Sequence, residues 1–410
     1  MKKNKILYSV WLIVISAIIA LTSCTEEIDF KTESFESALV IEATITNEFK
    51  FQEVVLSRTF AFEEDGPNPE TNATVSIVSN AGEFVFNEIG DGKYVSINKF
   101  KAQENLNYTL RIVTNNGREY SSTSTQLTQS TQIDQLYAVR ETDDLSVNGM
   151  AIYIDSFDPT NNSKFYRYEY EETYKIIAPM WVNKEILVLD NFTCEVDLVF
   201  KDPTLETQTC YNTVKSIKIN QTNTNALNED RITRHLIRFI ESENFILSHR
   251  YSILVKQFVQ SPQAYRYYET LNNFSEEGSI FSQIQPGFFN GNVFSVSNPI
   301  EKVIGFFDVS TVTSERIFFN YTDFYPDENI PPFPINCIPT NHNQFTISGY
   351  CGSLITGLIS DRIVYHSGAS KIIDYKTGDS IVIGPFLMLL KPCGDCTAYG
   401  NNLVPEFWEE

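Results

Sequence analysis

The sequence predicts a mainly β protein, in which an N-terminal immunoglobulin-like or transthyretin-like β-sandwich precedes a larger β-rich domain with a short helical insertion. The first observation behind this prediction is that apolar and polar residues alternate at period two through most of residues 38–127. The second is that β-branched and aromatic residues dominate the later apolar segments. The third is that breaks containing Gly or Asn separate the alternating segments, as they do in β-hairpins.

Seven short strands are expected in the N-terminal region. They are residues 39–46, 53–60, 73–80, 83–89, 93–100, 107–114 and 118–125. Between them, Ala81-Gly82, Gly90-Asp91-Gly92 and Asn115-Asn116-Gly117 provide residues that tolerate positive φ. Seven strands at this spacing favour a sandwich. The region has no Cys-Trp-Cys core pattern, so nothing supports membership of the true antibody-type family.

The polar run STSTQLTQSTQ at 122–132 is the best candidate for a linker to the second domain. In that domain the predicted strands are 151–157, 165–176, 185–190, 216–219, 235–241, 250–259, 303–310, 315–322, 362–367 and 380–389. A helix is predicted to begin at Ser261-Pro262, an N-cap followed by a proline at the first helical position, and to end before Gly278. Its aromatic face, from Tyr265 to Phe274, is expected to pack against a sheet rather than to bind a ligand.

The first 23 residues have the pattern of an export signal. Three lysines precede an apolar run at 6–21, which is shorter than the roughly 18 residues that a membrane-spanning helix needs. Leu21-Thr22-Ser23-Cys24 resembles the bacterial lipobox, in which a peptidase cuts before a cysteine that carries diacylglycerol. The predicted organisation is therefore a lipoprotein signal peptide at 1–23, a tether at 24–37 that begins with lipidated Cys24, a β-sandwich domain at 38–127 and a β-rich domain at 133–410. The alternative is a signal-anchor helix with an incidental cysteine.

Acidic residues follow this cysteine directly. Glu26, Glu27 and Asp29 resemble the short export signal that sends lipoproteins of the Bacteroidota to the outer face of the outer membrane. Acyl chains contribute about 0.8 kcal/mol per buried methylene, so several chains on Cys24 make a stable membrane anchor. The expected location is the outer membrane, with the protein lipid-anchored and facing the cell exterior.

The chain is strongly acidic, with 31 Lys and Arg residues, 52 Asp and Glu residues and a net charge of −21. Without the three lysines of the leader, 28 basic residues remain and the net charge is −24. The negative electrostatic field of such a chain repels phosphate backbones, and no basic stripe in the sequence offsets it. Nucleic-acid binding is therefore disfavoured.

Six cysteines follow Cys24: Cys194, Cys210, Cys337, Cys351, Cys393 and Cys396. An even number in an exported chain predicts disulfides, although six cysteines allow 15 connectivities. Local pairs of Cys194 with Cys210 and of Cys337 with Cys351 are possible, and Cys393-Gly394-Asp395-Cys396 closes on itself or pairs with the second couple. Each local loop is worth about 3 kcal/mol in the chain-entropy treatment. A redox role for this CxxC is disfavoured, because a redox CxxC opens a helix that follows a strand and this one does not have that pattern. A structural zinc site is disfavoured because the compartment is oxidising.

Motifs for catalysis are absent from the sequence. The four histidines form no HExxH or other i, i+4 pair, and there is no G-x-S-x-G elbow. Phosphate-binding glycine loops are missing as well, so no nucleotide cofactor is expected. These absences favour a protein that is not an enzyme, although two carboxylates for glycoside hydrolysis would be brought together only by the tertiary structure.

Acidic loops and tyrosines each allow a binding role and a structural one. Glu63-Glu64-Asp65-Gly66 and the acids from Asp323 to Glu328 place oxygen ligands in loops, as calcium sites do, but solvated turns are the favoured interpretation and no metal is assigned. Tyr166, Tyr168 and Tyr170 share one strand face. Cross-strand packing is favoured over stacking on sugars or peptides.

Four segments, together with the lipobox and the strand-rich N-terminal region, resemble the lipoprotein family of the Bacteroidota known as domain of unknown function 4249. They are FYRYEYEETYKIIAP at 165–179, HRYSILVKQFVQSPQAYRYYETL at 249–271, GNVFSVSNPIEKVIGFFDVS at 291–310 and CGDCTAYGNNLVPEFW at 393–408. The resemblance covers nearly the whole chain. It implies an outer-membrane lipoprotein that is often expected beside a TonB-dependent transporter, and it assigns no catalytic role to any residue.

The leading functional hypothesis is therefore a binding or accessory component of a TonB-dependent nutrient uptake system. Its expected partners are the membrane, through the N-terminal lipid, and a TonB-dependent transporter. The alternative is a cell-surface adhesin or structural lipoprotein, and a secreted-type hydrolase is the third, less favoured hypothesis.

Overall fold

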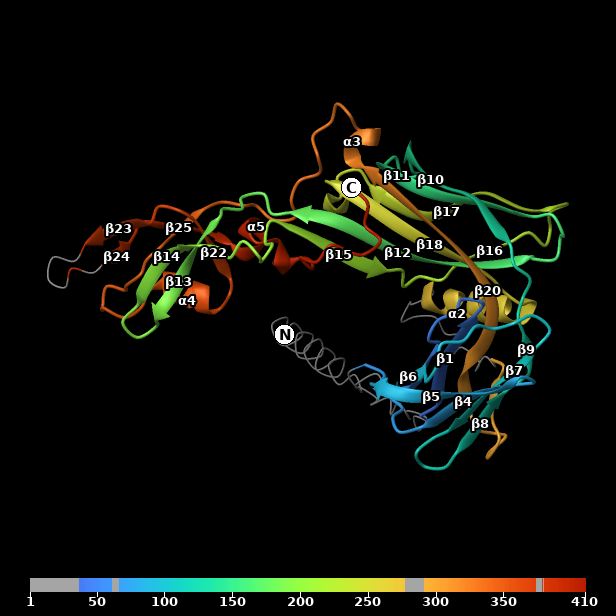
Figure 1. Ribbon diagram of the computed structural model, residues 1–410. Helices are drawn as coiled ribbons and strands as arrows, with labels where there is room; N and C mark the ends of the chain where they lie inside the picture. The colour runs from blue at the N-terminus through green and yellow to red at the C-terminus, as the bar shows by residue number, and fades with distance from the viewer. Residues whose placement is uncertain (1–36, 61–65, 277–290, 374–377, 379) are drawn as a thin grey trace, which may run out of the picture.

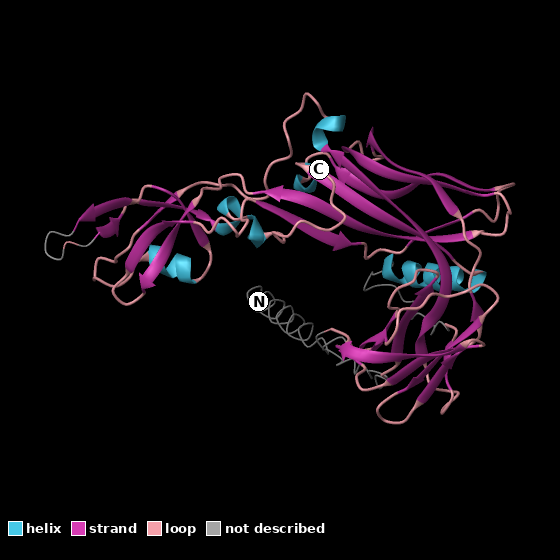
Figure 2. Cartoon of the chain, viewed as in Figure 1, coloured by secondary structure: helices cyan, strands magenta, loops and turns pink. Residues whose placement is uncertain are grey.

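The computed structural model describes residues 37–60, 66–276, 291–373, 378 and 380–410. Strands dominate these residues, and helices are few and short (Figure 2). Figure 1 shows that they form three β-rich units, which we call the N-terminal, middle and distal units. The distal unit lies at one end of the molecule, and the middle unit lies between it and the N-terminal unit. The predicted mainly β fold is confirmed.

The N-terminal unit is built from strands whose alternate residues are buried. Its elements are β1 (Leu39–Thr46), β2 (Glu53–Arg58), β3 (Asn68–Pro69), β4 (Thr74–Ser79), β5 (Gly82–Gly90), β6 (Lys93–Ser96), β7 (Asn107–Val113), β8 (Glu119–Ser122), β9 (Thr125–Gln126), β19 (Val293–Ser295) and the first half of β20 (Val303–Asn320). All seven strands that the sequence predicts in this region are present. In β1 the residues Leu39, Ile41, Ala43 and Ile45 are buried, as the period-two pattern requires.

Two strands from late in the chain complete this unit. β20 pairs in parallel with β1, and β19 pairs with the edge of β8. Gly305 of β20 has φ +153°, and a Cβ there would lie 2.5 Å from the carbonyl oxygen of Ile41, so only glycine allows the two strands to approach this closely. The predicted sandwich boundaries of 38–127 leave these strands out, because a strand's neighbour in a sheet need not be near it in the sequence.

The middle unit is a sandwich of two sheets around one large core. One sheet contains β10 (Gln132–Thr142), β11 (Asn148–Asp158) and β17 (Asp230–Glu241); the other contains β12 (Phe165–Ile177), β15 (Thr209–Lys215), β16 (Asn220–Asn223), β18 (Arg250–Val259) and the second half of β20. β20 is thus a single strand that belongs to two units, where the sequence suggested separate strands at 303–310 and 315–322. The predicted linker at 122–132 runs past this strand, and the Oγ of Thr128 accepts a hydrogen bond from the backbone N–H of Thr311.

Helix α2 (Pro262–Glu276) is the predicted helical insertion. Ser261 caps it, because its Oγ accepts a hydrogen bond from the N–H of Ala264 at 3.1 Å. Ala264 and Tyr267 pack against Phe306 of β20, so the predicted core packing of this face is confirmed for these residues. In Figure 1 the helix lies between the N-terminal and middle units. Gly278, where the helix was expected to stop, is outside the described residues.

The distal unit joins a central hairpin of the chain to its C-terminal part. Its elements are β13 (Lys184–Asp190), β14 (Glu195–Phe200), β21 (Thr340–His342), α4 (Ser353–Ile359), β22 (Ile363–Ser367), β23 (Ser370–Ile373), β24 (Ser380–Ile383) and β25 (Phe386–Leu390). The remaining short helices are η1 (Phe245–Leu247), α3 (Tyr321–Phe324), α5 (Lys391–Gly394) and η2 (Cys396–Ala398). The predicted strand at 380–389 is two strands, separated at Gly384-Pro385.

All six cysteines that follow Cys24 form disulfides, but neither suggested local loop exists. Cys194 pairs with Cys351, Cys210 with Cys396 and Cys337 with Cys393. The first bond lies within the distal unit, and the other two tie the C-terminal segment to the middle unit and to the loop after α3. Each bond joins cysteines at least 56 residues apart. The fold, not the sequence spacing, brings their Cα atoms to 5.3–5.6 Å, within the usual range for a disulfide.

Candidate functional site

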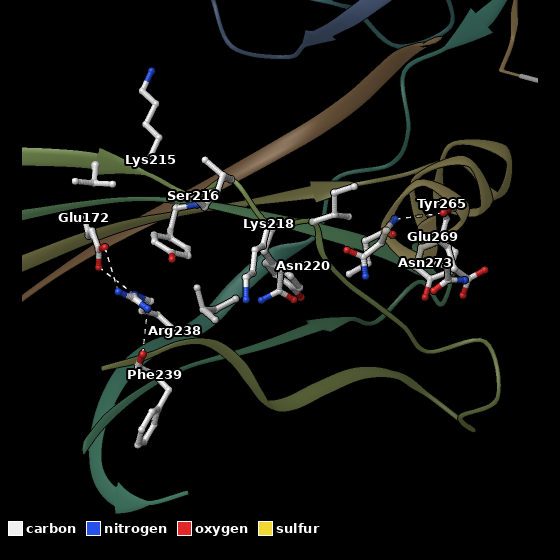
Figure 3. A pocket seen from close by; sticks show the side chains of 18 residues that line it. Glu172, Lys215, Ser216, Lys218, Asn220, Arg238, Phe239, Tyr265, Glu269 and Asn273 are labelled. Carbon is white, nitrogen blue, oxygen red and sulfur yellow. Dashed lines mark hydrogen bonds and ion pairs between the residues drawn. The ribbon is translucent and has the colours of Figure 1, made fainter. Parts of the chain in front are cut away.

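A cleft of about 760 Å³ lies at one side of the middle sandwich (Figure 3). It is lined by β17 of one sheet, by β12, β15 and β16 of the other, and by α2. Of these strands, β17, β15 and β16 are the outermost in their sheets among the described residues. The lining residues are Tyr168, Tyr170, Glu172, Val214, Lys215, Ser216, Ile217, Lys218, Ile219, Asn220, Gln221, Ile237, Arg238, Phe239, Tyr265, Glu269, Asn272 and Asn273. Its volume is that of a typical small-ligand pocket.

The segment between β15 and β16 bulges out of the sheet at this cleft. The backbone N–H of Ser216 donates to the carbonyl of Tyr170, and its Oγ accepts from the N–H of Tyr170. The chain then leaves the ladder, and the side chain of Ile217 is 96% exposed. The predicted strand at 216–219 is therefore wrong. Ile217 and Ile219 alternate with polar residues as in a strand, but both lie in the bulge between β15 and β16. The bulge also carries Lys218.

A buried charged group forms one wall of the cleft. Glu172 of β12 is buried and accepts hydrogen bonds from Nε and Nη2 of Arg238 at 3.2 and 3.4 Å. The hydroxyl of Tyr251 donates to the same carboxylate at 2.7 Å. Desolvation and the neighbouring carboxylate both raise the pKa of Tyr251 well above its ordinary value, so the phenol stays a hydrogen-bond donor. With Glu172 paired in this way, the carboxylate serves to position Arg238.

His235 fixes the base of the bulge on β16. Its Nε2 lies 2.7 Å from Oδ1 of Asn220, and its ring stacks on Tyr168 with centroids 4.9 Å apart. Burial lowers the pKa of His235 to about 4, so the ring is neutral at pH 7. Because an amide oxygen only accepts, the neutral ring carries its proton on Nε2. Asn220 in turn donates to the carbonyl of Leu236 on β17 at 3.0 Å.

Helix α2 presents polar side chains to the other end of the cleft. The Nε2 of Gln221 donates to Oε1 of Gln260 and lies 3.4 Å from the carbonyl of Tyr265. Glu269 and Asn273 lie on the same side as Tyr265 in Figure 3. Among the described residues no ion pair is formed by Glu269 or by Lys218. Lys218 extends toward the same side as Asn220, whereas Lys215 extends away from the other side chains.

The three tyrosines of β12 have the packing role that the sequence favoured. Tyr166 and Tyr168 are buried, and Tyr170 packs against the same core. The hydroxyl of Tyr166 donates to Asp230 at 2.9 Å. Tyr168 and the half-buried Tyr170 also line the cleft.

A second candidate surface lies on the distal unit, where one disulfide joins two loops. The bond Cys194–Cys351 connects the β13–β14 turn with the loop before α4. These loops carry four exposed apolar side chains, which we call the apolar tip: Phe192, Phe345, Ile347 and Tyr350. The side chain of Phe192 is 94% exposed. Exposed apolar residues gathered on one surface are typical of protein-contact sites.

The predicted acidic loops have ordinary structural partners where the structure describes them. Asp323 accepts from the N–H of Asn320 at the start of α3, and Glu328 forms an ion pair with Arg140. Residues 63–65 of the other acidic loop are outside the described residues. Where the structure describes the chain, no three His, Cys, Asp or Glu side chains are grouped as metal ligands.

The predicted lipidation and export residues, Cys24, Glu26, Glu27 and Asp29, also lie outside the described residues. Among the residues that the structure describes, no helix is both long and apolar enough to span a membrane. Three charged residues of the cleft have no ion-pair partner in the described part of the chain, and one of them, Lys215, extends away from the other side chains. The other two, Lys218 and Glu269, were not identified from the sequence. No local motif marks them, because they are 51 positions apart and only the fold brings them to one cleft.

Comparison with protein families gives one match. The family model described as domain of unknown function, DUF4249, matches residues 25–316. This range contains every residue of the cleft, and it ends before the C-terminal segment that the sequence resemblance included. No curated protein matches the chain.

Proposed function

The chain belongs to this family, domain of unknown function 4249, and on that basis we propose that it is a surface-anchored outer-membrane lipoprotein that serves as a binding or accessory component of a TonB-dependent uptake system. Lipid on Cys24 would hold the N-terminal unit at the membrane. The acidic residues Glu26, Glu27 and Asp29 would direct the protein outward. The finer elements of this proposal, the anchor, the location and the transporter, are supported by the sequence pattern and by what the family resemblance implies.

The observation that carries the accessory role is the apolar tip. Its four side chains are held on loops joined by a disulfide, so their display to solvent is built into the fold. Exposing apolar side chains is unfavourable in water, by about 25 cal/mol per Å² of apolar surface. A partner surface that covers Phe192 and Tyr350 would recover this free energy, and aromatic side chains dominate the binding energy of protein interfaces. We propose that the transporter supplies that surface.

Affinity purification of the lipidated protein from native membranes, with mass spectrometry of the co-purified proteins, tests this function. The expected result is recovery of a TonB-dependent transporter in a fixed ratio. The double variant Phe192→Ser, Tyr350→Ser should reduce that recovery at least tenfold, since each interface aromatic commonly contributes more than 1 kcal/mol. The matched control, Ile300→Ser, removes an exposed apolar side chain from a loop between β19 and β20 and should leave recovery unchanged.

A second variant separates anchoring from docking. Cys24→Ala should abolish incorporation of labelled fatty acid into the chain, because it removes the lipidated residue. Repeated recovery of the wild-type protein without any transporter would overturn the accessory role and favour the adhesin hypothesis. Fatty-acid labelling that persists in Cys24→Ala, or that is absent from the wild-type protein, would overturn the lipid anchor.

A further inference from the structure

We propose that the cleft of the middle unit binds an extended oligopeptide with free termini, its carboxylate beside Lys218 and its ammonium beside Glu269. This inference deepens the proposed function by naming the chemical class of the ligand, and it rests on that function only in treating the chain as a binding component. The observations that carry it are the edge strands, the unpaired charges of Lys218 and Glu269, and the other polar and apolar side chains of the lining.

Edge strands supply the main-chain recognition that a peptide requires. β17 pairs only with β11, and β16 pairs only with β12, among the described residues. The C-terminal segment bridges β15 at Tyr211, which leaves the part of β15 from Val214 onward without a second partner. An extended peptide binds such strands by adding hydrogen bonds along the edge. A ligand without a repeating N–H and C=O pattern cannot use them in this way.

The charges of the cleft match the two ends of a peptide. The chain as a whole has a net charge of −21, yet Lys218 projects into this cleft without an ion-pair partner in the described part of the chain. Glu269 lies on α2 at the other end and is likewise unpaired among those residues. A zwitterionic ligand satisfies both groups at once, whereas a purely anionic or cationic ligand would satisfy only one. Glu172 and Arg238 are already paired with each other and remain part of the wall.

The other side chains of the cleft suit a peptide with mixed residues. Ile217 is exposed and Val214 is 41% exposed at the rim, so both offer apolar contact. Asn273 and Gln221 add amide groups to the lining. Two tyrosines of the lining already have aromatic or apolar neighbours: His235 stacks on Tyr168, and the half-buried Tyr170 packs against the core. The unpaired charges and the open strand edges of the cleft favour a peptide over a neutral oligosaccharide, which has neither charged ends nor a main chain that can pair with a strand.

Affinity selection with the purified, detergent-solubilised full chain tests the proposal without any transporter. The probe is an equimolar library of tri- to hexapeptides with free termini, and bound peptides are identified by mass spectrometry. N-acetylated and C-amidated forms of the retained peptides, and cellotetraose, are then compared by calorimetry. Each terminal charge is expected to contribute a two- to fivefold gain in affinity, the range of exposed ion pairs, and the gain should shrink as salt is added.

Two charge reversals locate the termini. Lys218→Glu should abolish the preference for a free carboxylate but keep the preference for a free ammonium, and Glu269→Lys should do the opposite. A change in protein stability alone would not produce this reciprocal pattern. Lys101→Glu and Glu104→Lys, which reverse exposed charges on the N-terminal unit, are the matched controls and should change neither preference.

The outcomes separate this inference from the proposed function. Retention of peptides whose end preferences respond to both variants supports the site, whether or not a transporter is recovered from membranes. Retention of no peptide, binding of cellotetraose instead, or peptide binding that is indifferent to both variants would overturn the site. None of these results bears on the apolar tip, which is tested by the transporter recovery alone.

Discussion

His235 should make the middle unit sensitive to mild acid. Its imidazole is buried against Tyr168 and Asn220, and burial lowers its pKa from 6.5 to about 4. A histidine whose pKa is lower in the folded state binds its proton more tightly in the unfolded chain. Acid therefore favours unfolding. The stability that the neutral His235 ring contributes is complete above pH 6.5 and is lost as the pH falls from 6.5 to about 4.

The magnitude follows from the size of the shift. A difference of one pKa unit corresponds to 1.36 kcal/mol, so the full loss is about 3 kcal/mol, and about 2 kcal/mol of it is reached by pH 5. In the variant His235→Phe the apolar ring keeps the stacking on Tyr168 but has no proton to bind. The free energy of unfolding of this variant should therefore fall about 2 kcal/mol less between pH 7.5 and pH 5 than that of the wild type.

Two measurements check this prediction. Histidine-selective NMR should show one of the four imidazoles titrating near pH 4, and the signal should be missing in His235→Phe. Urea unfolding at the two pH values gives the difference in stability. His249, whose pKa burial also lowers, is common to both proteins and cancels in the comparison. Titration of the His235 signal near 6.5, or an equal pH dependence in the two proteins, would refute the reasoning.

Three further changes test other parts of the fold. Glu172→Ala should destabilise the middle unit by about 3 kcal/mol, because Arg238 loses its partner at a largely buried site; an unchanged urea midpoint would contradict the pairing. Gly305→Ala should lower the free energy of unfolding by well over 1 kcal/mol, because the new Cβ meets the adjoining strand and the φ is unfavourable for alanine. Its control is Gly117→Ala, in an open turn of positive φ, which tests the backbone strain without the contact. Replacing both Cys194 and Cys351 by serine should lower stability by about 2–4 kcal/mol and reduce transporter recovery, since the apolar tip is no longer held; full recovery would show that the tip does not need the bond.

Strands and the helix could be predicted because their signals are local. The alternation of Leu39, Ile41, Ala43 and Ile45 marks β1 within eight residues, and Ser261-Pro262 marks the start of α2. The bulge at 216–219 was mistaken for a strand, since two isoleucines at period two have the same pattern whether or not the backbone stays in the ladder. The even number of cysteines likewise predicted disulfides but not their partners.

The sequence by itself therefore determined the mainly β class, most strand positions, the α2 helix, the acidic charge and the lipobox pattern at Cys24. The tertiary structure alone decided which segments meet: β20 beside β1, Cys210 beside Cys396, and Lys218 with Glu269 in one cleft. The physical reason is that backbone conformation depends on neighbouring residues and on which face is buried, whereas sheet pairing, disulfide formation and the convergence of charges depend on contacts between residues far apart in the chain.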